Sequence, residues 1–374
     1  MLKKLIPLVL AACLLFTGCT TWLDGYYSHV IPFEGSAGET DNQNTTVKDY
    51  AELTKALAAL AESGTQNGII WVPEYDQESL NKDLSQAIDE VKTKNPIAAY
   101  AVDEILCDVG TNTGRAAIAV NITYIHDKTE ILKIRRVRNI TQGTTVIHEN
   151  LDNYADSVVL YFTTLPKTDF VQLVEDYAES NPQKVMEIPK VTVNIYPEDG
   201  LSHVVELKFT YENSRERLRT MQRLVGDKFE AASLYVSGEG SKTEKLTLMY
   251  TFLMERHDYQ IETSITPAYS LLQYGKGDAK AFATVFAALC REAGLEAHVI
   301  TGTRGGEAWY WNLVYDGGTW YHVDLLRCRQ EGGFRERTDT EMVGYVWDYA
   351  NYPVSVRPAP EPTITETTPP EENA

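Results

Sequence analysis

The sequence predicts an α+β chain in which two small α+β units follow one another and precede a third α+β domain. Three observations support this prediction. Stretches of period-two alternation, typical of strands with one buried face, lie beside stretches with apolar residues at helical spacing. This strand and helix pattern occurs twice, with Thr123 and Tyr124 of the first copy matched by Thr210 and Tyr211 of the second. From Lys242 onward the pattern becomes mainly helical.

The N-terminus has the pattern of a secretory signal peptide. A basic start, MLKK, precedes an apolar run from Leu5 to Phe16 and then small residues before Cys19. The run is shorter than the roughly 20 apolar residues that span a bilayer, and the small residues resemble a bacterial lipobox. We expect a signal peptide over residues 1–18, a lipidated Cys19, and an extracytoplasmic chain anchored to the bacterial cell membrane by its acyl chains. An uncleaved anchor and a plain secreted protein are the alternatives.

Composition and charge narrow the classes of partner. The 374 residues are 43% hydrophobic, 10% aromatic and 23% charged, which is enough for two or three folded domains. The formal net charge is −19, and loss of Lys3 and Lys4 with the signal would make it −21. Such a surface repels nucleic acid, so we expect no nucleic-acid partner. The remaining thiols, at Cys107, Cys290 and Cys328, have no zinc-site spacing, and we expect no metal and no cofactor.

The segment after the lipidation site is a predicted linker. Residues 19–46 end in the polar stretch IPFEGSAGETDNQNTT, which is typical of a flexible spacer. The first α+β unit is predicted over residues 47–139 and the second over residues 143–225. Each runs strand, polar turn and amphipathic helix, then stops at Asn95-Pro96 or Asn181-Pro182, because proline cannot continue a helix. Two alternating stretches then close each unit, and the alternative to a duplication is coincidence between two ordinary α+β segments.

Neither unit contains a catalytic set of residues. The basic run KIRRVR, from Lys133 to Arg138, alternates with apolar residues and is interpreted as a solvated strand face. At the other end of the chain, residues 357–374 are rich in proline, glutamate and threonine, and we expect a disordered tail.

The third domain is predicted over residues 226–356. Its first helix carries apolar residues at i, i+3 and i+4 spacing, at Leu246, Met249, Tyr250, Leu253 and Met254. A glycine-framed turn, YGKG, then leads into a second helix whose apolar positions are Phe282, Val285, Phe286 and Leu289. Three strands follow, with the sequences AHVITGT, EAWYWNLVYD and TWYHVDLL.

This domain resembles the transglutaminase-like domains of bacterial surface lipoproteins, which belong to the papain-like cysteine-enzyme superfamily. The resemblance depends on AYSLLQYGKGDAKAFATVFAALCREAGLEAHVITGT, EAWYWNLVYDGGTWYHVD and MVGYVWDYANYP. It extends from about Lys242 to Pro353 and implies a catalytic triad. A cysteine begins the helix after the glycine turn, a histidine follows on the second of the three strands, and an aspartate follows on the third. The helix N-terminus lowers a thiol pKa, and the histidine takes the thiol proton.

Two of the three implied triad residues are replaced in this chain. Ala279 occupies the cysteine position, and Trp309 occupies the histidine position in the stretch that normally reads His-Ala-Trp-Asn. Only Asp324 is retained. Alanine cannot attack a carbonyl group, and an indole N–H donates but cannot accept a proton. Because loss of the nucleophile typically costs about a millionfold in turnover, the sequence predicts a domain without transglutaminase or thiol-protease activity.

A relocated catalytic group is the first alternative. Cys290 lies inside the helical pattern and has the character of a core residue, whereas Cys328 lies between Arg327 and Arg329, which could lower its pKa. The carboxyl groups of Asp278, Glu307 and Asp324 could instead act as a pair in glycoside hydrolysis. His322 is interpreted as a structural residue.

The sequence therefore favours a binding or scaffolding role for a surface lipoprotein. A flat ring at Trp309 either fills the former catalytic groove or offers a stacking surface, with Trp311, Asp278 and Asp324 as further binding candidates. The expected partners are cell-wall polymer, an extracellular glycan or an extracellular protein. A second alternative is a structural spacer that binds nothing.

Overall fold

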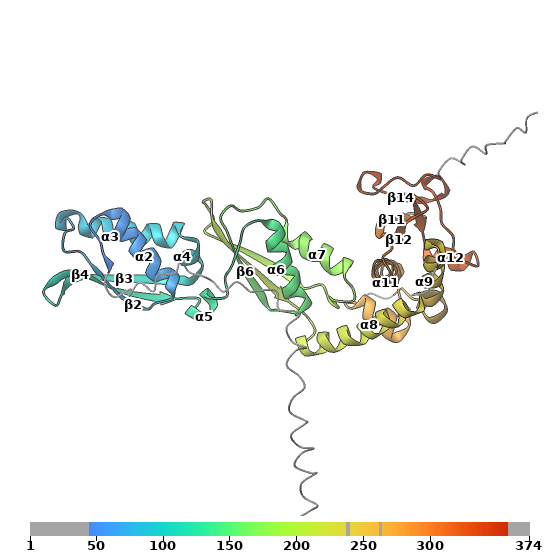
Figure 1. Ribbon diagram of the computed structural model, residues 1–374, viewed down its shortest axis with the longest axis horizontal. Coiled ribbons are helices and arrows are strands. Elements are labelled where there is room, and N and C mark those ends of the chain that lie inside the picture. The colour runs from blue at the N-terminus through green and yellow to red at the C-terminus, as the bar shows by residue number, and fades with distance from the viewer. Residues whose placement is uncertain (1–44, 237–239, 262–263, 358–374) are drawn as a thin grey trace, which may run out of the picture.

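A computed structural model describes residues 45–236, 240–261 and 264–357. The predicted signal peptide, Cys19 and nearly all of the predicted linker and tail lie outside the described residues. In Figure 1 the described chain forms three α+β parts, which follow one another in sequence order from the blue end to the red end. We call them unit 1, unit 2 and the C-terminal domain. The predicted α+β class is confirmed.

Unit 1 is a four-stranded sheet with helices on one face (Figure 1). The strand order is β1-β2-β4-β3, with β1 parallel to β2 and the other pairs antiparallel. Its elements are β1 (Thr45–Thr46), α2 (Tyr50–Ser63), β2 (Asn67–Trp71), α3 (Gln77–Lys94), α4 (Pro96–Ala101), β3 (Val102–Asn112), β4 (Arg115–Tyr124) and α5 (Lys128–Ile131). The two residues of β1 were expected to belong to the flexible linker, which therefore ends earlier than predicted.

The helices of unit 1 begin at polar caps and bury one apolar face. The side chains of Asp49 and Asp76 accept hydrogen bonds from the first turns of α2 and α3. Leu57 of α2 and Leu84 of α3 pack with Ile118 of β4 in one core cluster. Burial of a leucine or isoleucine side chain stabilises a fold by about 1.5–3 kcal/mol, so this face fixes the helices on the sheet.

The Asn95-Pro96 pair ends one helix and begins another. Helix α3 stops at Lys94, as predicted, but Pro96 is the first residue of α4 and the Asn95 side chain accepts hydrogen bonds from the amides of Ile97 and Ala98. Proline suits a first helical position because its missing N–H has no partner there in any helix. The predicted first strand after this stop is therefore shorter at its start, where the stretch AAYA is helical.

Unit 2 has the same strand order as unit 1, β5-β6-β8-β7, again with one parallel pair at the start. Its elements are β5 (Arg135–Val137), α6 (Ile140–Asp152), β6 (Ser157–Phe162), α7 (Phe170–Ser180), β7 (Lys190–Tyr196) and β8 (His203–Thr210). The duplication itself stays a prediction. The predicted boundaries need correction, because β5 pairs with β6 and so belongs to unit 2 rather than to residues 47–139. Helix α8 (Arg215–Tyr235) also runs through the boundary predicted at 225.

The C-terminal domain places one buried helix against an antiparallel sheet. The sheet order is β13-β12-β11-β14. The elements after α8 are α9 (Lys242–Arg256), β9 (Asp258–Tyr259), α10 (Pro267–Tyr274), β10 (Lys276–Gly277), α11 (Ala279–Glu292), β11 (Ala297–Arg304), β12 (Glu307–Asp316), β13 (Thr319–Val323), α12 (Leu325–Gln330), η1 (Asp339–Glu341), β14 (Tyr345–Trp347) and η2 (Tyr349–Asn351). All four predicted apolar positions of α11 and all five of α9 are buried.

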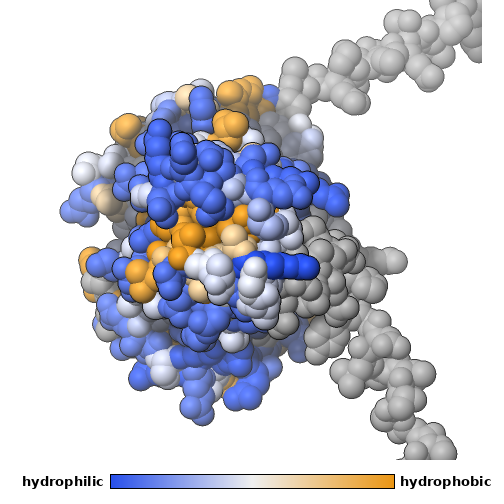
Figure 2. Space-filling view, turned by 90° about the vertical axis from the view of Figure 1, so that its left-hand side faces the viewer, coloured by the Kyte–Doolittle hydropathy of each residue, from blue (hydrophilic) through white to orange (hydrophobic). Residues whose placement is uncertain are grey.

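The three parts are joined by apolar contacts. Tyr100 of unit 1 packs with Val159 and Val204 of unit 2 in one cluster, and Tyr154 and Met186 of unit 2 belong to the core of the C-terminal domain. Figure 2 views the molecule from the end formed by unit 1, where hydrophilic residues surround one apolar area. Within the described ranges, no helix is both long enough and apolar enough to span a membrane.

Candidate functional site

The N-terminus of α11 is the point where the implied nucleophile would lie. Asp278 precedes the helix, and its Oδ1 accepts a hydrogen bond from the amide of Ala281 at 2.8 Å. Ala279 is the first helical residue and is 7% exposed. Gly277 permits the close turn before it, since a Cβ there would lie 3.0 Å from side-chain atoms of both Ala281 and Leu271. The local fold therefore presents residue 279 at a helix start, but the side chain is a methyl group.

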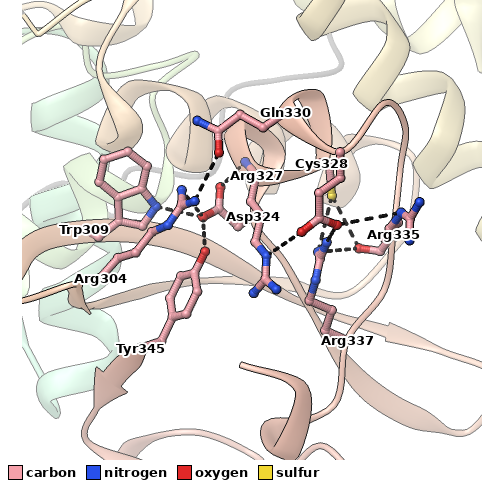
Figure 3. A network of polar contacts seen from close by, with 10 residues as sticks. Arg304, Trp309, Asp324, Arg327, Cys328, Gln330, Arg335, Arg337 and Tyr345 are labelled. Atoms are coloured by element: carbon pink, nitrogen blue, oxygen red, sulfur yellow. Dashed lines mark hydrogen bonds and ion pairs between the residues drawn. The ribbon is translucent and has the colours of Figure 1, made fainter. Parts of the chain in front are cut away.

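Trp309 and Asp324, the other two implied triad positions, contact each other directly. Trp309 lies on β12, and Asp324 caps the short helix α12 after β13. The indole Nε1 of Trp309 donates a hydrogen bond to Oδ2 of Asp324 at 2.8 Å. Figure 3 shows the Trp309 ring directed toward this carboxylate. The neutral indole thus makes the donor contact that an imidazole N–H would make to an orienting carboxylate.

Three further donors satisfy the Asp324 carboxylate, which is 1% exposed. Tyr345 donates its hydroxyl to Oδ2 at 2.6 Å, and Arg304 places Nη1 3.4 Å from the same oxygen (Figure 3). Oδ1 accepts from the backbone amide of Arg327 at 3.0 Å. A buried carboxylate is tolerated when it is paired with a cation and hydrogen-bonded. Asp324 meets both conditions, so its oxygens have partners at this position without a histidine.

The tyrosine in this network stays a donor. Burial, and then the negative charge of Asp324, raise the pKa of Tyr345 well above its usual value. Its hydroxyl therefore stays protonated at neutral pH and holds the carboxylate. Sequence reasoning singled out neither Arg304 nor Tyr345. Both lie in or beside stretches that carry the family resemblance, but only the pairing of β11 with β14, which places Arg304 opposite Tyr345, shows that they meet at Asp324.

The faces of the Trp309 ring are also occupied in part. The guanidinium of Arg304 lies 5.3 Å from the ring centroid, and the Tyr259 ring lies 5.9 Å away. Both distances fall within the range of cation–π and aromatic pairing. Trp309 is consequently a half-buried residue. Its indole N–H is held by Asp324 and its ring contacts Arg304 and Tyr259, so the ring is not a free stacking surface.

The space between the former triad positions is closed. Ala279, Asn312 and Asp324 line a gap that is too small to admit a water molecule. Asn312 is fully buried and donates Nδ2 to the carbonyl of Ala283 at 2.8 Å, whereas its Oδ1 has no hydrogen-bond partner in the part of the chain that the structure describes. A substrate carbonyl therefore has no room between Ala279 and Asp324.

Two predicted binding residues need correction. Trp311 is 1% exposed, and its Nε1 donates to Nδ1 of His322 at 3.0 Å. The other ring nitrogen of His322 lies 2.7 Å from Oδ1 of Asp339, and burial lowers the pKa of this histidine. Trp311 and Asp324 are thus interior residues that cannot contact a ligand at the surface. His322 has the structural position that the sequence predicted.

The thiols have the properties of core residues. Cys328 and Cys290 are both 0% exposed, and burial raises the pKa of each. The cation beside the Cys328 Sγ is Arg337, at 3.6 Å, rather than either arginine that flanks it in the sequence. Cys107 is half-buried, and burial raises its pKa to about 11. A thiol with a raised pKa is mostly protonated at neutral pH and is a poor nucleophile.

The carboxylates do not form an evident acid pair. Asp278 caps α11, Asp324 is enclosed by donors, and Glu307 is exposed at the start of β12. Across the described ranges, no group of three or more His, Cys, Asp or Glu side chains is arranged to hold a metal ion.

Comparison with known families and structures identifies the C-terminal domain. Residues 230–325 match the family model of the transglutaminase-like superfamily. The family resemblance predicted from the sequence is thereby confirmed for this domain, which begins inside α8. Among curated proteins, none matches this chain.

Three solved structures share low identity with the chain. A TGase structure is 13% identical over 55% of this chain and 61% of its own, with a TM-score of 0.26. A proposed cysteine protease from Cytophaga hutchinsonii is 14% identical over 42% and 70%, also with a TM-score of 0.26. A proposed protease from Parabacteroides distasonis is 10% identical over 68% and 39%, with a TM-score of 0.23. The chain therefore spans about three fifths of the first of these structures.

Proposed function

We propose that this chain, which contains a transglutaminase-like domain over residues 230–325, is a surface lipoprotein whose domain binds or scaffolds without catalysing a reaction. Its expected partners are cell-wall polymer, an extracellular glycan or an extracellular protein. The lipid anchor at Cys19 and the extracytoplasmic location come from the sequence pattern alone, because that residue lies outside the described ranges.

The proposed loss of catalysis rests on one observation. The indole Nε1 of Trp309 donates a hydrogen bond to the Asp324 carboxylate at 2.8 Å, and Ala279 supplies only a methyl group at the helix start. An acyl-transfer enzyme needs a nucleophile within hydrogen-bond reach of a base. Neither group is present at these positions, and the gap lined by Ala279 and Asp324 admits no water. The arrangement supports a stable scaffold rather than a reaction centre.

The alternatives receive less support from the geometry. A displaced nucleophile at Cys328 would need a thiolate at a fully buried position where burial raises the thiol pKa. A carboxylate mechanism would need a proton-transferring Asp324, but four donors fix that side chain. The spacer alternative predicts a chain without any ligand.

The proposal is tested by rebuilding the dyad in the full chain. We expect Ala279→Cys with Trp309→His to gain a thiol that iodoacetamide alkylates faster than Cys107 near neutral pH, because a helix N-terminus and an adjacent imidazole lower a thiol pKa. Ala279→Cys alone is the matched control and should react more slowly. Peptide mapping by mass spectrometry locates the alkylated residue.

Activity assays test the native chain directly. We expect the native chain to show no amine incorporation and no proteolysis above background. Turnover by the native chain that disappears in Cys328→Ser or Asp324→Asn would contradict the proposal and favour a relocated catalytic group. Co-sedimentation with purified cell walls tests the binding part, and a chain that neither pellets nor captures a protein partner would favour the spacer.

A further inference from the structure

A ligand-sized groove lies between unit 2 and the C-terminal domain, and its lining includes Asp278 and Lys280 on either side of Ala279 in the sequence but not Ala279 itself. One wall comes from α7 and the irregular segment 182–190 that leads into β7. The other wall comes from the start of α10 and the first turns of α11. The cavity volume is about 530 Å³, within the range of about 300–1,000 Å³ that is usual for ligand sites. We call it the interdomain groove.

The two walls are held together by direct contacts. Lys280 of α11 forms an ion pair with Glu179 of α7 at 2.5 Å, and Gln183 donates to Glu292 at 3.2 Å. Met186, which lines the groove, is 2% exposed and packs in the core of the C-terminal domain. The groove is thus a feature of the joined structure, and neither part forms it alone.

The lining includes apolar residues from both walls, and two isoleucines within it are open to solvent. Ile188 from unit 2 is 42% exposed, and Ile265 from the C-terminal domain is 49% exposed. Exposed aliphatic side chains from both walls of one concave surface offer apolar area to an incoming side chain. Concave apolar surface with a polar rim is typical of a binding site.

The charged residues of the groove are mainly acidic. Its carboxylates are Glu175, Glu179, Glu187, Glu212 and Asp278, whereas its ammonium groups are Lys190 and Lys280. Glu187 is 4% exposed and accepts hydrogen bonds from the backbone amides of Glu212 and Asn213, so it belongs to the framework. The chain as a whole carries a formal net charge of −19. A cationic ligand is therefore complementary both to the rim and to the surrounding field.

We propose that the interdomain groove binds an extended, basic peptide segment that carries aliphatic side chains. The acidic rim would take its lysine or arginine residues, and Ile188 and Ile265 would contact its aliphatic ones. Lys190 begins β7, which is an edge strand of the sheet of unit 2. An edge strand offers backbone donors and acceptors to an extended peptide. This inference does not depend on the loss of catalysis, because no former triad position lines the groove.

The test is a binding titration on the purified full chain. The probe is a fluorescein-labelled hexapeptide of alternating lysine and leucine, and fluorescence anisotropy follows its binding. Two companion peptides replace every leucine by serine or every lysine by glutamate. We expect saturable binding of the lysine–leucine peptide only, with affinity that falls as salt is added.

Two paired variants locate the site. Ile188→Ser with Ile265→Ser should weaken binding about tenfold, which corresponds to about 1.4 kcal/mol. Glu175→Gln with Glu212→Gln should weaken it severalfold and flatten the salt dependence. The matched control is Leu201→Ser with Glu198→Gln, an exposed pair on unit 2 outside the groove, which should bind as the native chain does. Thermal unfolding of each variant shows that the fold is retained.

Three outcomes would overturn the proposal. No binding of the lysine–leucine peptide would remove the site. Equal binding of the lysine–serine peptide would reduce the effect to attraction by net charge. Equal losses in the groove variants and in the control pair would place the peptide elsewhere on the acidic surface. None of these results bears on the rebuilt dyad, so this inference and the proposed function fail independently.

Discussion

At the scale of single residues, Asp324 keeps a family position with altered partners. Its carboxylate is surrounded by an indole N–H, a phenol hydroxyl, a guanidinium and a backbone amide. All four contacts donate to the carboxylate, and none of these four groups is a base that could take a proton from a nucleophile. The same residue that would orient a histidine in a triad enzyme therefore acts here as an anchor for β12, β14 and α12.

Trp309→Phe measures the contribution of the indole donor. The substitution keeps an aromatic ring beside Arg304 and removes only the hydrogen bond to the buried carboxylate. We expect the free energy of unfolding to fall by about 2 kcal/mol, as is typical for hydrogen bonds to charged groups. Urea denaturation gives the value.

Trp320→Phe is the control for this substitution, because the indole of Trp320 makes no hydrogen bond within the described ranges and its ring is likewise half-buried. Equal losses in the two variants would mean that the Trp309 contact to Asp324 adds no net stability.

Glu336 predicts a pH dependence of stability. Burial, and then Asp316, raise the pKa of its carboxyl group from the ordinary value of 4.5 to about 7. Between those two pH values the folded chain binds a proton that the unfolded chain has released. Stability from this group is therefore fully present below pH 4.5 and falls as pH rises from there through 7. We expect Glu336→Gln to match the native unfolding temperature near pH 4 and to exceed it at pH 8.

Thermal unfolding at intervals between pH 4 and pH 8 checks this expectation. Glu341→Gln is a contrasting control, because hydrogen bonds from Thr338 lower the pKa of Glu341. A native stability that does not change over this range, relative to Glu336→Gln, would show that Glu336 ionises normally in the folded chain.

The sequence identified the positions at the site but not all of their contacts. Ala279, Trp309 and Asp324 follow from the family pattern, and Trp309 and Asp324 do meet. Trp311 was predicted as a binding candidate at the former catalytic site, but alternation along β12 places it on a face that Tyr345 and Trp347 cover. Those residues come from β14, more than 30 positions later, so local periodicity could not reveal them.

At the scale of elements, local signals predicted helices α3, α7, α9 and α11, whereas α2, α6 and α8 were not predicted. The caps at Asp49, Asp76 and Asp278 lie where the sequence patterns change, and the apolar positions of α9 and α11 face the core as expected. Helix α4 was missed because the stretch AAYA has no periodicity of its own. Its short helix depends on the cap at Asn95 and on Pro96 at the first position, which are features of the backbone rather than of the apolar pattern.

Strand partners were harder to predict than strands. The basic run KIRRVR was interpreted as a strand face, and β5 does form there, with Arg135 and Arg136 exposed. The sequence did not show that this three-residue strand lies parallel to β6 and begins unit 2. Pairing is decided by contacts between distant segments, and so short a strand carries little pattern to specify its partner. The predicted boundary of unit 1 was wrong for this reason.

At the scale of the whole molecule, unit 1, unit 2 and the C-terminal domain are joined by packed apolar residues rather than being separate domains. Core residues of unit 2 lie inside the C-terminal domain, and α8 extends from one part into the other. The interdomain groove exists only because this joint fixes its walls. The joint thus creates a concave surface between two parts of the chain, whereas the gap beside Ala279 in the transglutaminase-like domain is closed.

Tyr154→Phe tests whether the joint also controls the groove. The buried Tyr154 hydroxyl donates to the carbonyl of Lys184 at 2.8 Å and accepts from the amide of Met186 at 3.1 Å, within the segment that forms one groove wall. Its carbonyl accepts from Arg215 at the start of α8. Removing the hydroxyl takes this partner from the buried amide of Met186, whereas the carbonyl of Lys184 keeps its hydrogen bond from Gln222. We expect a loss of about 2 kcal/mol together with faster amide exchange at Met186.

The comparison variant is Tyr177→Phe, which removes a hydroxyl that donates to the Asp152 carboxylate at 2.6 Å rather than to the backbone of the wall segment. Asp152 is 29% exposed, so water can replace the lost donor and the cost should be smaller. Hydrogen exchange by mass spectrometry reports the segment 182–190 in both variants. If Tyr154→Phe loosens that segment, the lysine–leucine peptide should bind the Tyr154→Phe variant more weakly than the Tyr177→Phe variant. The reason is that ordering a mobile wall segment on binding costs free energy and lowers the affinity. Faster amide exchange in this segment without any loss of peptide affinity would show that the order of the wall segment does not affect peptide binding.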